Sequence, residues 1–145
     1  MTTKLVFALL AVCAGIASSF QSAANGRLSQ RIGLGATMVI NTTVVLVGSL
    51  ALFIARRPHT NFFPVGTPWA EYIGGVCGFV IVFSLALAFP EIGAALTVAL
   101  LVLGQSVTAL AVDHYGLLGM PRDPISASRF AGLALVAGGV ALIRS

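Results

Sequence analysis

Long apolar stretches with almost no charge constrain this chain more than any other feature. Each holds roughly 20 residues, the number that a helix needs to cross the hydrocarbon core of a bilayer. We place the spans at about residues 4–26, 32–55, 69–89, 91–112 and 126–143. Because 58% of the residues are hydrophobic and only 8% are charged, a soluble domain of this length could not cover its surface. The sequence predicts an all-α membrane protein, a single domain of five transmembrane helices.

The first apolar stretch also has features of a secretory signal peptide. Lys4 precedes a short apolar core, and small residues follow at positions 17–24. We expect the segment to be retained as the first span.

The formal net charge of +4 does not indicate a nucleic-acid partner, because the basic residues stand singly or in pairs along the chain. They fit the flanks of membrane spans. A cytoplasmic N-terminus places five basic residues inside, namely Lys4, Arg56, Arg57, Arg122 and Arg129. The outside then holds Arg27, Arg31 and Arg144. This small excess favours an N-terminus in the cytoplasm, and the near balance also suits a chain that inserts both ways.

An odd number of spans puts the two termini on opposite faces of the membrane. Two copies in opposite orientations would form a ten-helix assembly with a two-fold axis in the membrane plane, the plan of many transporters. We therefore expect a homodimer, antiparallel in preference to parallel, or a pair with a sister chain.

Small residues at helical spacing indicate close packing of helices. Gly74 and Gly78 form a GxxxG pattern, and Ser128 and Gly132 repeat that spacing. These positions pack helices either within one chain or between two chains.

Uncharged polar residues fall on one face of three spans. Gln21 and Asn25 lie one helical turn apart, and Asn41 continues a face begun by Thr37. Gln105 and Thr108 lie on a similar stripe with Thr97 and Gly104. Polar groups at membrane depth are costly unless they are paired or hydrated. We predict that Gln21, Asn25, Asn41, Gln105 and Thr108 line a cavity for a small solute, and the alternative is that the amides only join helices.

No Asp, Glu, Lys, Arg or His lies near the middle of an apolar stretch. Glu91 stands at a helix start, and Asp113 and His114 stand at the end of the fourth span. Proton-coupled export of organic cations needs a carboxylate at the membrane midplane. We therefore expect a neutral, zwitterionic or weakly charged substrate. Glu91, Asp113 and His114 could gate or relay protons, whereas a solvated helix end is the plainer interpretation.

The sequence offers no pattern for catalysis, a metal or a cofactor. It lacks HExxH, GxSxG and a glycine-rich phosphate loop. Cys13 and Cys77 lie inside apolar runs without metal-ligand spacing. We expect a protein that is not an enzyme and holds no metal and no cofactor.

Three segments resemble the YdcZ family of the drug/metabolite transporter superfamily. They read QSAANGRLSQRIG, PWAEYIGGVCGFV and FPEIGAALTVALLVLGQSVTALAVDHYGLLGMPRDPIS. The family has a Q-x-x-x-N-G-R-L segment, a G-Q within a later helix and a D-H-[FY]-G end. The resemblance covers nearly the whole chain. The family pattern indicates the following candidate functional residues: Gln21, Asn25, Arg27, Gln105, Asp113 and His114.

The resemblance implies a five-helix half-transporter of the bacterial inner membrane that dimerises with itself or with a sister chain. The resemblance does not indicate which substrate is transported. Unlike the related small multidrug resistance proteins, the chain has no glutamate within its first span. We expect a small secondary transporter that works by alternating access, with membrane lipid around it. The alternatives are a membrane assembly protein that transports nothing and a flippase for a lipid carrier.

Overall fold

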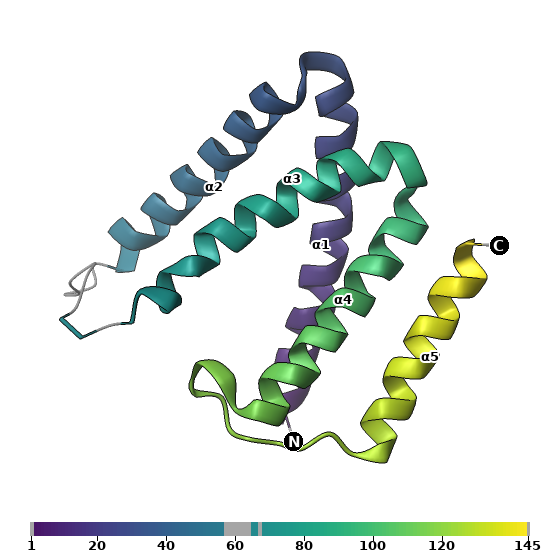
Figure 1. The fold of residues 1–145 in the computed structure, drawn as a ribbon. Coiled ribbons are helices and arrows are strands. Elements are labelled where there is room, and N and C mark those ends of the chain that lie inside the picture. The colour runs from purple at the N-terminus through teal and green to yellow at the C-terminus, as the bar shows by residue number, and fades with distance from the viewer. Residues whose placement is uncertain (1, 57–64, 67, 145) are drawn as a thin grey trace. The chain divides into compact units, whose positions relative to one another are not determined.

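Five α-helices make up the fold in the computed structural model, which describes residues 2–56, 65–66 and 68–144 (Figure 1). The helices are α1 (Thr2–Ile32), α2 (Leu34–Arg56), α3 (Gly74–Ile92), α4 (Ala94–Tyr115) and α5 (Ala127–Arg144). The 3-10 helices η1 (Trp69–Ile73) and η2 (Leu117–Gly119) precede α3 and follow α4. All five α-helices are long and apolar enough to cross a membrane, so the predicted all-α membrane fold is confirmed.

Helix α1 continues beyond the apolar run that we assigned to the first span. It passes through Arg27 and Arg31 and stops at Gly33, whose φ of +85° favours glycine. Arginine, glutamine and leucine all support a helix, so the fall in hydropathy after Gly26 does not end it. The amides Gln21 and Asn25 therefore lie well inside the helix.

The chain divides into two compact units. The first, Met1–Glu91, contains α1, α2 and α3, and the second, Ile92–Ser145, contains α4 and α5.

In the first unit, α1 approaches α3 closely at Gly26. A Cβ atom added to this buried glycine would lie 3.2 Å from Phe89 Cβ and 3.3 Å from Pro90 Cδ. Pro90 lacks the N–H that would otherwise donate to the Ala86 carbonyl one turn earlier. Ser29 Oγ of α1 lies 3.5 Å from that carbonyl oxygen and donates to Gly26 O at 2.8 Å. Two segments that carried the resemblance, NGRLS and FPEIG, thus meet at this crossing.

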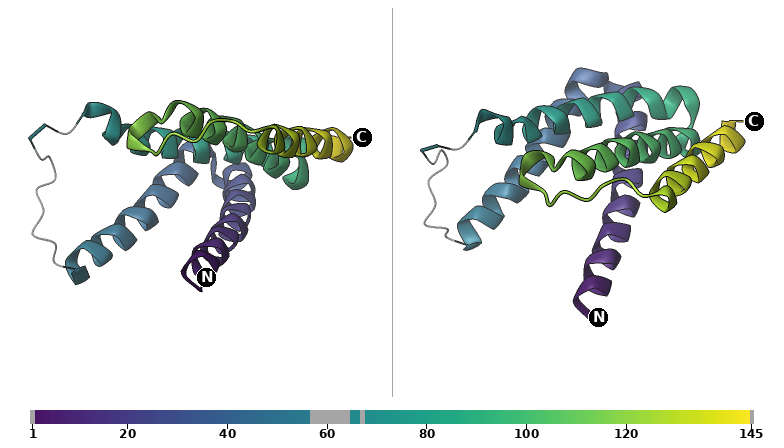
Figure 2. Two further views of the ribbon diagram at one scale, coloured as in Figure 1. Left: turned by 90° about the horizontal axis from the view of Figure 1, so that it is seen from below. Right: turned by 60° about the horizontal axis from the view of Figure 1, so that its bottom comes forward.

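In the second unit, α4 and α5 lie side by side as a hairpin, which both Figures 1 and 2 show. Helix α4 ends at Gly116, which has φ +64° and donates its N–H to Val112 O. Helix α5 begins after Ser126, whose Oγ accepts the Arg129 N–H at 3.3 Å. A serine in this position satisfies one of the free donors at a helix start.

Large apolar side chains remain exposed along the helices of the single chain. Leu9, Val44, Val76 and Leu135 are all more than half exposed. On a membrane protein such faces meet lipid or another membrane-embedded chain.

Candidate functional site

Three amide side chains meet between α1 and α2. Gln21 Nε2 donates to Asn41 Oδ1 at 3.0 Å, and Asn25 Nδ2 donates to the same oxygen at 3.1 Å. Asn25 is buried, while Gln21 remains exposed along part of its side chain. The amide cluster, Gln21, Asn25 and Asn41, satisfies polar groups of both helices without any charge.

A cavity of about 370 Å³ lies beside the amide cluster, bounded by α1, α2 and α3. Gln21, Asn41 and Thr42 form its polar side. Gly75 and Gly78 contribute backbone from α3. The rest of the lining is apolar and comprises Met38, Val45, Phe79 and Val82.

The amide cluster lies within two helices that are long and apolar enough to cross a membrane. Gln21 stands eleven residues before the end of α1, and Asn41 stands seven residues after the start of α2. At about 1.5 Å per residue, they lie about 16 Å and about 10 Å from the turn that joins these helices. We therefore expect both amides to lie within the hydrocarbon core of a bilayer, which is about 30 Å thick. A polar wall at this depth is where a transported solute would need hydrogen-bonding partners.

The hydroxyls of the predicted stripes bond mostly to their own helices. Thr37 donates to Gly33 O at 3.0 Å, and Thr97 donates to Gly93 O at 2.7 Å. Thr108 likewise donates to Gly104 O at 3.0 Å. These bonds satisfy the hydroxyl protons locally, so the amides are the side chains left to reach between helices.

Gln105 and Thr108 belong to the second unit, whereas the amide cluster belongs to the first. Both side chains are exposed on α4. The structure brings together Gln21, Asn25 and Asn41 of the predicted substrate residues. A shared cavity with Gln105 and Thr108 stays a prediction.

The glycines that we expected to pack helices have free space around them in this chain. A Cβ atom added at Gly74, Gly78 or Gly132 would meet no other described atom within 4 Å. Gly78 instead lines the cavity. The glycine at the close crossing is Gly26, which the sequence pattern did not single out.

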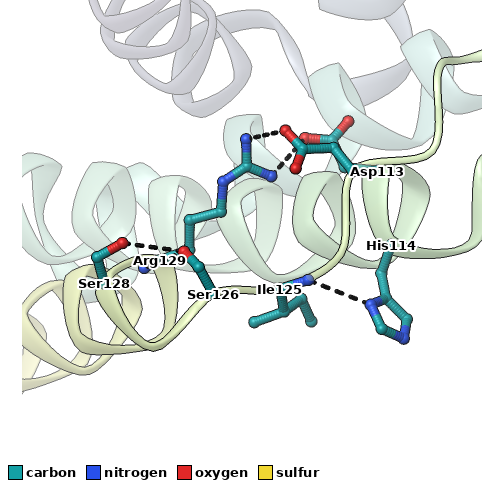
Figure 3. A network of polar contacts seen from close by, with 7 residues as sticks. Asp113, His114, Ile125, Ser126, Ser128 and Arg129 are labelled. Atoms are coloured by element: carbon teal, nitrogen blue, oxygen red, sulfur yellow. Dashed lines mark hydrogen bonds and ion pairs between the residues drawn. The ribbon is translucent and has the colours of Figure 1, made fainter.

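A second polar cluster joins the end of α4 to the start of α5 (Figure 3). Arg129 forms ion pairs with Asp113, at 3.7 Å between Nη1 and Oδ2, and with Asp123. Asp123 N donates to Asp113 O at 2.8 Å, which returns the loop to the helix end. We call Asp113, Asp123 and Arg129 the ionic cluster.

Pairing within the ionic cluster stabilises charges that stand at unfavourable helix ends. Asp113 lies in the last turn of α4 and Arg129 in the first turn of α5, which are the unfavourable ends for their charges. Pairing offsets both helix-dipole costs. All three side chains are more than a third exposed, so solvent screens the attraction. The sequence pattern did not predict these ion pairs of Arg129.

His114 holds the same loop. Its Nδ1 accepts the Ile125 N–H at 3.2 Å, and its carbonyl accepts from Arg122 Nε at 3.1 Å. Figure 3 shows the ring turned toward Ile125. Because a backbone N–H can only donate, Nδ1 carries no proton in this arrangement. The structure gives Asp113 and His114 a part in shaping the loop, and their gating role stays a prediction.

Glu91, which we placed at a helix start, is instead exposed in the last turn of α3, because the helix continues through Pro90 to Ile92. It belongs to the first unit, and Asp113 and His114 belong to the second. Its role in gating also stays a prediction.

A family model described as "Putative inner membrane exporter, YdcZ" matches residues 6–142. The match runs from the start of α1 to the last turn of α5. The chain belongs to the YdcZ family. No curated protein and no solved structure shows significant similarity to it.

Membership of the YdcZ family confirms the resemblance seen in the sequence segments. With five membrane-spanning helices, this chain is a multi-pass membrane protein. The family is described by export across a membrane, which supports a transporter in place of an enzyme.

Proposed function

We propose that the chain is one half of a small secondary transporter in the bacterial inner membrane. It carries a small neutral, zwitterionic or weakly charged solute by alternating access. One observation carries this proposal: Gln21 and Asn41 line a cavity of about 370 Å³ between helices long and apolar enough to cross a membrane, in a member of an exporter family. Amides that served only to join α1 and α2 would need no cavity beside them.

We further propose that two copies work together in opposite orientations. The support is the odd number of spans and the near balance of basic residues between the two sides. A parallel dimer and a sister chain are the other arrangements. Glycines such as Gly74 and Gly132, open in the single chain, would let a partner helix approach closely.

Cysteine labelling tests alternating access at the cavity. In a Cys13→Ala, Cys77→Ala background, Thr42→Cys places a thiol in the cavity lining, and Thr43→Cys is the matched control. Thr43 is the next residue of α2, lies outside the lining and bonds to Val39 O at 2.8 Å. A maleimide that cannot cross the membrane is added from one side at a time.

Alternating access predicts that Thr42→Cys reacts to completion from either side, because the cavity of every copy opens in turn to each side of the membrane. If the cavity of each copy opens to a single face of the membrane, the fraction labelled from one side and the fraction labelled from the other side together account for all copies. That result contradicts alternating access and favours an assembly protein. The Thr43→Cys thiol should react slowly from both sides, because it faces away from the cavity.

Orientation is read from Arg144→Cys in the same background. An antiparallel homodimer predicts labelling of comparable fractions from the two sides, and crosslinks between opposite ends of two copies. Labelling from one side only excludes that homodimer and leaves a parallel dimer or a sister chain.

A further inference from the structure

We infer that the cavity selects an uncharged, amphiphilic solute that offers both a hydrogen-bond donor and an acceptor next to an apolar body. This inference rests on the proposed transport function and narrows its substrate class. The groups that carry it are the amide cluster on one wall and the apolar side chains on the others.

The polar wall keeps free donors on the Asn41 amino group and a free acceptor on the Gln21 carbonyl oxygen. Asn41 Oδ1 already accepts from both Gln21 and Asn25. Within the described part of the chain, Asn41 Nδ2 and Gln21 Oε1 make no further hydrogen bond. A primary or secondary amide, or a hydroxyl beside a carbonyl, satisfies both.

The lining disfavours a charged solute. Its described residues comprise two amides, one hydroxyl, two glycines and four apolar side chains, with no ionisable group among them. An ion taken from water into such a site meets no opposite charge, so no interaction offsets the free-energy cost of its desolvation. A zwitterion meets the same cost twice. The nearest basic residue along α1, Arg27, lies outside the lining.

The apolar wall fits a flat hydrocarbon group. Phe79 lines the cavity and stacks on Phe83, with ring centroids 5.9 Å apart. An aromatic ring of the solute could extend this stack. Gly75 and Gly78 carry no side chain into the cavity, so α3 leaves room at that wall. The volume lies near the lower end of small-molecule sites, which hold roughly 300–1,000 Å³.

Protection of the Thr42→Cys thiol tests the charge preference. Four probes share the same benzyl body: N-acetylphenylalaninamide is neutral, N-acetylphenylalanine is an anion, phenylalaninamide with its amine protonated is a cation, and phenylalanine is a zwitterion. Each is titrated against maleimide modification of the purified full-length variant. We expect the neutral probe to protect at a concentration at least about tenfold below that of any charged probe. Equal or better protection by a charged probe overturns the inference, and so does protection by none of the four.

Two glycine variants test the place of binding. Gly78→Val adds a side chain to the cavity wall, and Gly48→Val adds the same side chain on α2 outside the lining. Neither added Cβ meets a described atom within 4 Å, so both variants should fold. Gly78→Val should raise the half-protecting concentration of the neutral probe about tenfold. Gly48→Val should change it by less than about twofold. Equal effects of the two variants place binding elsewhere and contradict the inference.

The two proposals fail in different ways. Failure of transport shows as Thr42→Cys labelling that does not reach completion from both sides. Failure of the substrate class shows as complete labelling from both sides together with protection by a charged probe.

Discussion

The two units of this molecule handle polarity in opposite ways. The first places uncharged amides within apolar helices, where Gln21 and Asn25 share the oxygen of Asn41. The second places charges at the helix ends, where Arg129 pairs with Asp113 and Asp123. Desolvation explains the difference, because an amide needs only hydrogen bonds at membrane depth whereas a charge needs water or a partner. The amide cluster can therefore face a cavity, and the ionic cluster holds a loop.

The largest effect is expected where α1 approaches α3 in the first unit. Gly26→Leu forces a side chain against Phe89 and Pro90, where even a Cβ atom would lie 3.2 Å from its neighbour. Overpacking of this kind destabilises by about 2 kcal/mol or more. Unfolding in a denaturing detergent measures the loss. Gly15→Leu is the control on the same helix, where an added Cβ meets no described atom, and an equal loss in both variants would contradict this crossing.

The second-largest effect is expected in the amide cluster. Asn41→Leu removes the acceptor of two donors and leaves the buried Asn25 without its partner. We expect a loss of about 1–3 kcal/mol in the free energy of unfolding, unaffected by salt because no charge is involved. Detergent unfolding at low and high salt checks both points. A Thr43→Val control, on the same helix, should unfold close to the parent chain.

The loop of the second unit depends on the backbone at Gly116. Its φ of +64° is unfavourable for other residues, and an added Cβ would lie 3.3 Å from Met120 O. Gly116→Ala should cost about 1–2 kcal/mol. Gly104→Ala, within α4 and open to a Cβ, should be neutral or stabilising. Thermal unfolding of both variants gives the comparison, and a stable Gly116→Ala protein would show that the loop does not need this turn.

The smallest effect is expected in the ionic cluster. Asp113→Asn removes one partner of Arg129, but the pair is partly exposed, so we expect a loss of about 0.5–1 kcal/mol. High salt should shrink this loss, whereas it leaves the Asn41→Leu loss unchanged. The salt response separates the two clusters. A salt-independent loss for Asp113→Asn would contradict the electrostatic account.

The sequence predicted the fold because spans depend on length and hydropathy, which are local properties. It also placed Gln21 and Asn25 on one face, because helical spacing fixes that face. It did not predict that Asn41 accepts from both, since the register between two helices depends on how their side chains pack.

Other contacts leave no local signal in the sequence. Gly26 is one of 16 glycines, and nothing in its neighbourhood marks it as the crossing point. Gly74, Gly78 and Gly132 match the packing pattern yet are open in this chain. Likewise, the pairing of Arg129 with Asp113 depends on a loop whose course follows from the turn at Gly116.

The most direct test of the central claim measures transport across liposome membranes. Labelled N-acetylphenylalaninamide is loaded into proteoliposomes, and its exit is followed for the parent chain, Gln21→Leu and a Ser19→Ala control. Gln21→Leu keeps the Asn25 to Asn41 bond, and Ser19 bonds only to Gly15 O of its own helix. We predict that the parent chain and Ser19→Ala speed the exit above that of protein-free liposomes, and that Gln21→Leu, folded and assembled in equal amount, does not. Equal exit with Gln21→Leu and the parent chain would contradict the claim that the amide cluster binds the transported solute.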